Sequence, residues 1–131
     1  MGPEAFMKLK YPNMREELVD YLSGLSDLDY QRNVWVAGKN PPGIGHDELD
    51  YAIHFIFDDT CLAENSSSAI GDILFNQEEA DSVDALVDAL NRIFGKYGVN
   101  LTDSGYVEKS EWTSVLQAAK SARDILCRNI N

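Results

Sequence analysis

The chain has 131 residues, 44% of them hydrophobic, and a formal net charge of −11 at pH 7. This length is typical of a single domain, and so many apolar residues exclude an intrinsically disordered chain. The strong excess of acidic residues argues against nucleic-acid binding, because phosphate groups are bound by basic surfaces.

Three further features predict a cytoplasmic protein that is not inserted in a membrane, and the cytoplasmic location follows from the cysteines. No apolar run approaches the ~20 residues that a membrane-spanning helix needs. The first ten residues lack the apolar centre of a signal peptide. Cys61 and Cys127 are far apart in the sequence. We therefore expect two free thiols rather than a disulfide framework.

The N-terminal third of the chain shows helical periodicity after an irregular start. Residues 1–12 are expected to form an irregular arm, because Pro12 stops any earlier helix. A helix follows to about residue 23, with Asn13 as its N-cap. A shorter helix continues through Trp35, although residues 34–36 would also suit a short strand. The segment up to His46 is rich in glycine and proline and is expected to form a loop.

The next helix is expected over residues 47–59, and its two faces differ in character. Apolar residues recur at steps of three and four, as on one side of an α-helix. These residues are Leu49, Ala52, Ile53, Ile56 and Phe57. The opposite side is polar. Its residues are Asp47, Asp50, Tyr51, His54 and Asp58.

His54 can be interpreted in three ways, one of which is a contact with a partner protein. It lies one turn from Asp50 and from Asp58, so it could bind a divalent metal ion or transfer a proton if a second helix supplied further ligands. Alternatively, it is a histidine held by its helical neighbours, with no chemical role. Asp58 and Asp59 lie at the C-terminal end of the helix, where the helix dipole disfavours negative charge. A compensating partner or a capping role is therefore expected for them.

The C-terminal half of the chain contains the clearest helices. Residues 60–71 are expected to form a polar loop. Asn76 should cap a long helix over residues 77–96. A turn-rich connection over residues 97–106 leads to a last helix over residues 110–128. The sequence contains no convincing strand alternation.

The predicted fold is therefore all-α, a single-domain bundle of four or five helices over residues 1–131. The central members of the apolar stripes are expected to form the core. These residues are Leu18, Ile53, Phe57, Leu86, Leu90, Trp112 and Leu116.

The most unusual property of the sequence is the position of its negative charge. Residues 40–91 contain 12 acidic residues and no Lys or Arg, while the rest of the chain is nearly balanced. Such a segment favours a basic partner, a cationic ligand or a metal ion, although it could also serve only to keep the protein soluble. The expected contact residues are Asp47, Asp50, Tyr51, His54, Phe55, Asp58, Asp59, Asp81, Asp84 and Asp88. Tyr51 and Phe55 are the aromatic anchors of this set.

Four short stretches of the sequence are distinctive. They are Tyr30-Gln31 with Trp35, residues 54–59, Ile70-Gly71 and the helix start at Glu78-Glu79-Ala80. Together they resemble a small, largely uncharacterised family of bacterial helical proteins. This resemblance covers roughly residues 11–126 and implies no activity. In size, charge and helical character the chain also resembles immunity proteins of bacterial toxin systems, including contact-dependent growth inhibition.

The sequence therefore favours a non-enzymatic acidic binding protein without a cofactor. In its most concrete form, this is an immunity protein that neutralises a basic toxin domain, for example a nuclease, by direct binding. The alternative is a small metal-binding protein or metal-dependent hydrolase that uses His54 and the neighbouring carboxylates.

Overall fold

The computed structural model describes residues 9–37, 48–60 and 62–129, and over these residues the protein is all-α, as predicted. This part of the chain contains no strand, only one isolated bridge between Ile70 and Leu74. The α-helices are α1 (Pro12–Leu25), α2 (Leu28–Tyr30), α3 (Leu49–His54), α4 (Leu62–Asn65), α5 (Gln77–Tyr97), α6 (Asp103–Val107) and α7 (Trp112–Arg128). Two π-helical segments, η2 (Gln31–Val36) and η3 (Phe55–Asp59), extend α2 and α3, and a 3₁₀ turn, η4 (Ser66–Ala69), follows α4.

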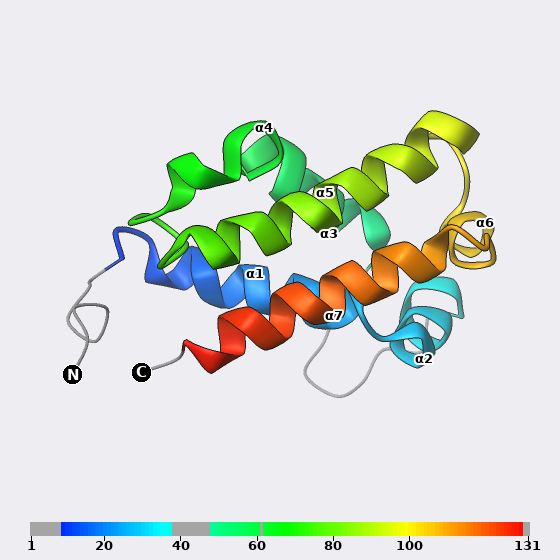
Figure 1. The fold of residues 1–131 in the computed structure, drawn as a ribbon. Coiled ribbons are helices and arrows are strands. Elements are labelled where there is room, and N and C mark those ends of the chain that lie inside the picture. The colour runs from blue at the N-terminus through cyan, green and yellow to red at the C-terminus, as the bar shows by residue number, and fades with distance from the viewer. Residues whose placement is uncertain (1–8, 38–47, 61, 130–131) are drawn as a thin grey trace.

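The long helices α5 and α7 lie side by side and run in opposite directions (Figure 1). Helix α1 packs against α7, and the α4–η4 segment packs along α5. At one end of the bundle α6 packs against η2. None of the helices in the described ranges combines the length and the apolar character that crossing a membrane requires.

The start of α1 differs from the sequence prediction. Pro12 is the first residue of the helix, where the missing N–H of proline would have no helical partner in any case. Asn13 is therefore inside the helix, and the cap position belongs to Tyr11. The backbone N–H groups of Lys10 and Tyr11 donate to Gly71 and Asp72, so the segment before α1 lies against the turn before α5.

The helix predicted over residues 47–59 is formed by α3 and η3, and two elements cover it. Tyr21 of α1 packs on Phe55, with ring centroids 5.0 Å apart. Phe94 of α5 packs on Phe57, with centroids 6.4 Å apart. Phe55 lies off the apolar stripe, but it is only 2% exposed because α1 covers that side. The prediction that Phe55 is an aromatic anchor on the surface is therefore wrong.

Two short helical elements lie in segments that were predicted as loops. Residues 62–69 form α4 and η4, and the buried hydroxyl of Ser66 donates to the backbone oxygen of Ala80 on α5. Helix α6 begins at Asp103 and is capped by Thr102, whose side chain accepts from the N–H of Gly105. Their amphipathic patterns are too short to distinguish from a loop, since a single turn offers only one or two apolar positions.

Most of the predicted core residues are buried. Leu18, Leu86, Leu90 and Trp112 are at most 1% exposed. The other three predicted core residues only pack against the buried cluster from its edge and are partly exposed. These residues are Ile53, Phe57 and Leu116. Trp112 also donates its indole N–H to Gln31 at 2.8 Å, and Gln31 donates to Gly24, so a buried amide joins α7 to η2 and α1.

A buried ion pair at the start of α5, which we call the Arg15–Glu79 hub, joins four distant segments. The Arg15 guanidinium donates two hydrogen bonds to the Glu79 carboxylate, at 2.7 and 2.8 Å, and two more to the backbone oxygens of Ile73 and Leu126. Asn129 also donates to Glu79. The hub therefore fixes the N-terminal end of α5 against α1 and the C-terminal end of α7.

The other end of α5 is joined to α7 through Glu111. After Tyr97 the chain turns at Gly98, whose φ of +81° suits glycine. The Glu111 carboxylate accepts from Lys96 and from the Tyr97 hydroxyl. The hydrogen bond from Lys96, followed by that from Tyr97, lowers the pKa of Glu111 from 4.5 to about 2.

This contact gives a prediction for acid titration. In wild-type protein we expect the Glu111 carboxyl carbon, followed by NMR, to titrate well below 4.5, with a pKa of about 2. In Lys96→Gln the titration should move back towards pH 4.5, because the main donor loses its charge. Since the folded pKa is depressed, the stabilising contribution is present above pH 4.5 and is lost as the pH falls towards 2. An unchanged titration in Lys96→Gln would contradict this assignment.

Candidate binding surface

Helix α5 carries three of the predicted contact residues on its exposed side, and we call them the α5 acidic stripe. Asp81, Asp84 and Asp88 recur at steps of three and four and are all exposed. Asp81 accepts from Gln77 on the same helix, and Asp84 accepts from Ser66 of η4. Both partners are neutral, so the negative charge of these carboxylates is not neutralised within the described residues.

A second set of acidic residues, Asp50, Asp58 and Asp59, lies along α3 and η3 and is also exposed. Asp50 is in the first turn of α3, where the helix dipole favours a carboxylate. Tyr51 beside it is 42% exposed. Among the described residues, no hydrogen bond connects this second set with the α5 acidic stripe. Asp47 lies outside the described residues.

His54 and Asp58 form a pair on the surface. The Nδ1 atom of His54 lies 2.6 Å from a carboxylate oxygen of Asp58, and both side chains are more than 60% exposed. His54 therefore contacts Asp58, one of the two helical neighbours that the sequence places one turn away from it. The C-terminal end of η3 is also capped, because the Thr60 hydroxyl donates to the backbone oxygens of Phe55 and Ile56. Asp58 therefore has a hydrogen-bond partner, whereas the contacts within the described residues give Asp59 none, so the expectation is met for Asp58 alone.

The structure places no metal-binding cluster around His54 in the described ranges. In residues 9–37, 48–60 and 62–129, no group of three or more His, Cys, Asp or Glu side chains converges closely enough to hold a metal ion. His46 and Cys61 lie outside these ranges. Cys127 on α7 is a free, partly buried thiol.

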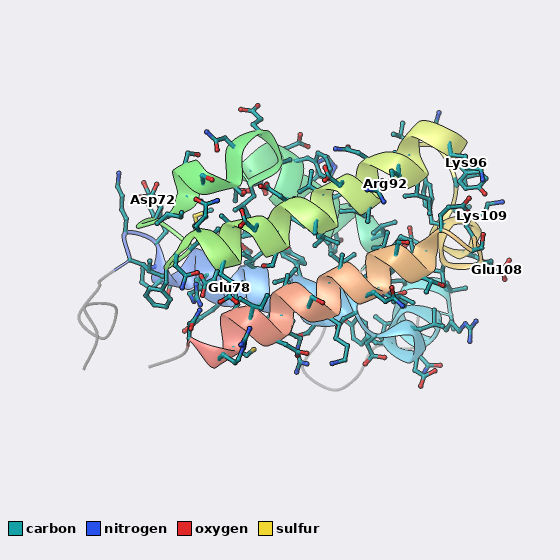
Figure 2. The ribbon with its side chains drawn as sticks, in the orientation of Figure 1. Asp72, Glu78, Arg92, Lys96, Glu108 and Lys109 are labelled. Atoms are coloured by element: carbon teal, nitrogen blue, oxygen red, sulfur yellow. The ribbon has the colours of Figure 1, made fainter. Side chains whose placement is uncertain are left out.

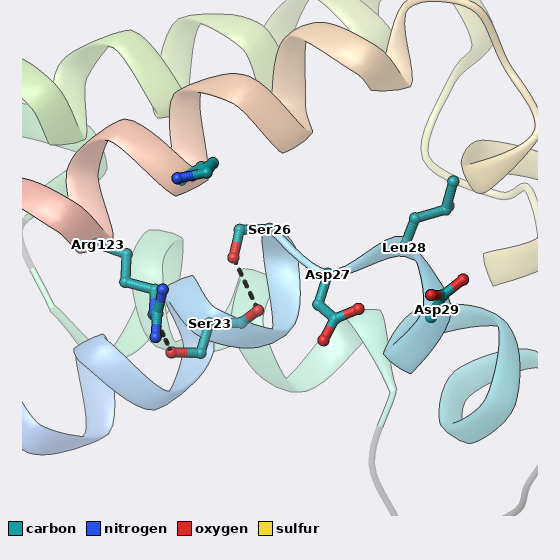
Figure 3. A pocket seen from close by; sticks show the side chains of 7 residues that line it. Ser23, Ser26, Asp27, Leu28, Asp29 and Arg123 are labelled. Carbon is teal, nitrogen blue, oxygen red and sulfur yellow. Dashed lines mark hydrogen bonds between the residues drawn. The ribbon is translucent and has the colours of Figure 1, made fainter.

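A polar recess of about 360 Å³ lies between the end of α1, the start of α2 and α7 (Figure 3). Arg123 of α7 donates to the Ser23 hydroxyl at 3.0 Å, and the Ser26 hydroxyl donates to the backbone oxygen of Ser23. Asp27 caps α2 by accepting from the N–H of Tyr30. Most polar groups of the recess are thus used within the protein, and the contacts hold α7 against α1.

The residues that orient these surfaces are hardly distinguished by any sequence pattern. In the sequence, Glu79 is distinguished only by its position three residues after the predicted cap Asn76. The cap itself is confirmed, because the Asn76 side chain accepts from the N–H of Glu79. The Glu79 side chain instead accepts from Phe75 and Arg15. Arg15 lies in an ordinary surface-like pattern, so nothing in the sequence distinguished it from the exposed Glu16 and Glu17 beside it.

Comparison with known proteins gives information only about the family of the chain. No curated protein and no solved structure matches the chain. One family model, described as "Domain of unknown function (DUF7945)", matches residues 9–130. This match agrees with the prediction of an uncharacterised family. Since it covers nearly the whole sequence, the chain belongs to the DUF7945 family.

Proposed function

We propose that this protein acts by binding a basic partner protein through its exposed carboxylates, and that it is not an enzyme. The observation that carries the proposal is the α5 acidic stripe. Asp81, Asp84 and Asp88 are exposed, and their charges have no Lys or Arg partner among the described residues. Opposite potentials on two proteins steer their encounter and accelerate association.

The ion pairs of the described residues support this choice of surface. Lys96, Lys120 and Arg123 pair with acidic residues outside the segment 40–91. Among the described residues of that segment, only Glu78 and the buried Glu79 pair with arginines. Exposed like charges repel one another, so the remaining carboxylates are more useful to a partner than to folding.

In its most concrete form, the partner is a toxin domain with a basic surface, for example a nuclease, and the protein is its immunity protein in a bacterial cytoplasm. A nuclease surface that attracts phosphate would equally attract a row of carboxylates. Tyr51 is the exposed aromatic residue closest in sequence to the second acidic set and would serve as an anchor.

The direct experiment is co-expression of the chain with the product of the neighbouring gene. We expect a stoichiometric complex whose formation slows as salt rises, and protection of the host cell if that product is toxic. The metal alternative predicts a different result. Stoichiometric divalent metal in the purified protein, lost in His54→Ala and with no partner recovered, would overturn the proposal.

Neutralising the α5 acidic stripe gives a quantitative prediction. In Asp81→Asn/Asp84→Asn/Asp88→Asn, association with the basic partner should slow by roughly tenfold at low salt, because steering of this kind contributes 10- to 1,000-fold. The loss should shrink above ~0.15 M salt, where the Debye length is about 8 Å. Stability should stay the same or rise slightly, since repulsion is relieved. Stopped-flow mixing measures the rates.

A matched control removes the same number of charges from another helix. Glu16→Gln/Glu17→Gln/Asp20→Asn changes three exposed acidic residues on α1, so both triple variants have the same net charge. The α1 variant should associate nearly as fast as wild type. Equal slowing in both variants would mean that only the total charge matters, and would contradict a docking role for α5.

A further inference from the structure

A groove of about 360 Å³ runs between α5 and α7. Small side chains line it from both helices. These residues are Ser82, Ala85 and Ala89 of α5 and Ser114, Ala118 and Ser121 of α7. Asp88, Arg92 and Gln117 supply its longer polar side chains. The groove therefore borders the α5 acidic stripe through Asp88.

Ion pairs join the two helices on either side of this groove. At the N-terminal end of α5, Glu78 pairs with Arg128 of α7 at 3.7 Å. At its C-terminal end, Lys96 pairs with Glu111. Figure 2 shows Arg92 on the stretch of α5 between Glu78 and Lys96. The helix pair is thus fixed at both ends, while its middle is recessed and lined by small residues.

The open stretch has the dimensions of a helix-binding surface. From Ser82 to Arg92 the helix advances about 15 Å, at about 1.5 Å per residue, which corresponds to about three turns. Small residues on both walls allow the backbone of another helix to approach closely. Binding of an amphipathic helix in such a groove is a common mode of peptide recognition.

The charges of the groove indicate what such a helix must carry. Asp88 and Arg92 lie one helical turn apart, and both are exposed. They form no ion pair with one another or with another residue of the described chain. Asp81 and Asp84 lie outside the groove, and Asp84 accepts from Ser66 of η4, but both add to the negative potential along α5 towards its N-terminal end. A complementary helix is therefore mainly basic, with one acidic residue placed near Arg92.

We propose that the groove between α5 and α7 binds a basic amphipathic helix of the partner protein, about three turns long. Small apolar residues of that helix face Ala85, Ala89 and Ala118. A Lys or Arg meets Asp88, and an Asp or Glu meets Arg92. This inference rests on the proposed function and adds to it the part of the partner that is recognised.

The test uses a synthetic peptide of about 18 residues, longer than the 12–15 below which isolated helices are marginal. The peptide has alanine on one face, lysine along both borders of that face and one glutamate a turn from a lysine. Titrated into isotope-labelled full-length protein, it should shift the amide signals of Ala85, Ala89 and Ala118. No shift at these residues up to about 1 mM peptide, the range of very weak binding, would overturn the inference.

A pair of variants decides whether the groove itself is the site. Ala85→Leu/Ala118→Leu fills the groove at two positions that are not fully buried and should weaken peptide binding at least about tenfold, or 1.4 kcal/mol. Thr113→Leu adds a larger apolar side chain to an exposed position of α7 outside the groove and should bind within about twofold of wild type. Circular dichroism of each variant checks that the fold is retained.

The possible failures can be distinguished. If filling the groove changes nothing while the triple Asn variant binds more weakly, docking uses the α5 acidic stripe without the groove, and only this inference fails. If the product of the neighbouring gene does not bind and the protein holds metal lost in His54→Ala, the proposed function fails. A concentration-dependent dimer that the filled variant abolishes would identify a second copy as the occupant and overturn the inference.

Discussion

Glu79→Gln is expected to lower the free energy of unfolding by about 3–5 kcal/mol, because it leaves a buried guanidinium without its counter-charge. The Arg15 side chain is 9% exposed and that of Glu79 is 0% exposed. Glutamine can still accept a hydrogen bond from Phe75, so the loss reports mainly on the charge. Denaturant unfolding followed by fluorescence of the buried Trp35 and Trp112 measures the change.

A double-mutant cycle provides the control. Arg15→Met alone should also be strongly destabilising, since it leaves the Glu79 carboxylate buried. Arg15→Met/Glu79→Gln should lose less than the sum of the single losses, by roughly 0.5–3 kcal/mol, because neither variant then contains an uncompensated buried charge. Additive losses would show that Arg15 and Glu79 do not interact in solution.

The same pair makes stability depend on pH. Burial raises the pKa of Glu79, but the hydrogen bonds from Arg15, Phe75 and Asn129 outweigh it and hold the pKa below 4.5. A carboxyl with a depressed pKa stabilises the protein above 4.5, and this contribution is lost as the pH falls through the folded value. The difference in stability between wild type and Glu79→Gln should therefore be largest at neutral pH and shrink in acid.

Leu90→Ala is expected to cost about 2–5 kcal/mol, since it removes three buried carbon atoms and leaves a cavity. Leu90 is 0% exposed, on the side of α5 that faces the core. The measurement is again denaturant unfolding. A loss under about 0.5 kcal/mol, which is typical of surface positions, would place Leu90 outside the core.

Leu101→Ala is the matched control for this substitution. It makes the same chemical change at a leucine that is 36% exposed, in the connection between α5 and α6. Because less apolar surface is lost and water can fill the space, we expect a clearly smaller cost, below about 1 kcal/mol. Similar losses at both positions would indicate that the connection is as well packed as the core.

The long helices could be predicted from the sequence because their periodicity extends over several turns. The helix predicted over residues 77–96 is observed over residues 77–97, with Asn76 as its cap. The last helix begins two residues later than predicted, at Trp112, and ends at Arg128 as predicted. Both helices bury one side only, so a single apolar stripe describes them well.

The errors arise where tertiary contacts decide the outcome. Phe55 is expected among the exposed contact residues, but α1 and α5 cover two sides of the helix that carries it, and Phe55 packs against α1. Arg15 was not singled out because its buried partner is 64 residues away in the sequence. The periodicity of apolar residues shows which side of a single helix is buried, but it does not show whether a second helix covers another side.

The candidate surface could be predicted only as a charge pattern. The exposure of Asp81, Asp84 and Asp88 follows from their position opposite the apolar stripe of α5. The groove between α5 and α7 could not be predicted, since it depends on which helices are adjacent and on small residues such as Ala85 and Ala118 facing one another. Small residues alone give no signal of binding in a sequence.

The Arg15–Glu79 hub has a consequence for the folding kinetics. Its hydrogen bonds join residues separated by 58, 64 and 111 positions along the chain. These contacts can form only when distant parts of the chain have come together, and closing such long loops costs conformational entropy. We therefore expect them to form after the transition state of folding. Interactions that are absent from the transition state act on the rate of unfolding. The hub should therefore prolong the lifetime of the native protein while hardly changing how fast it folds.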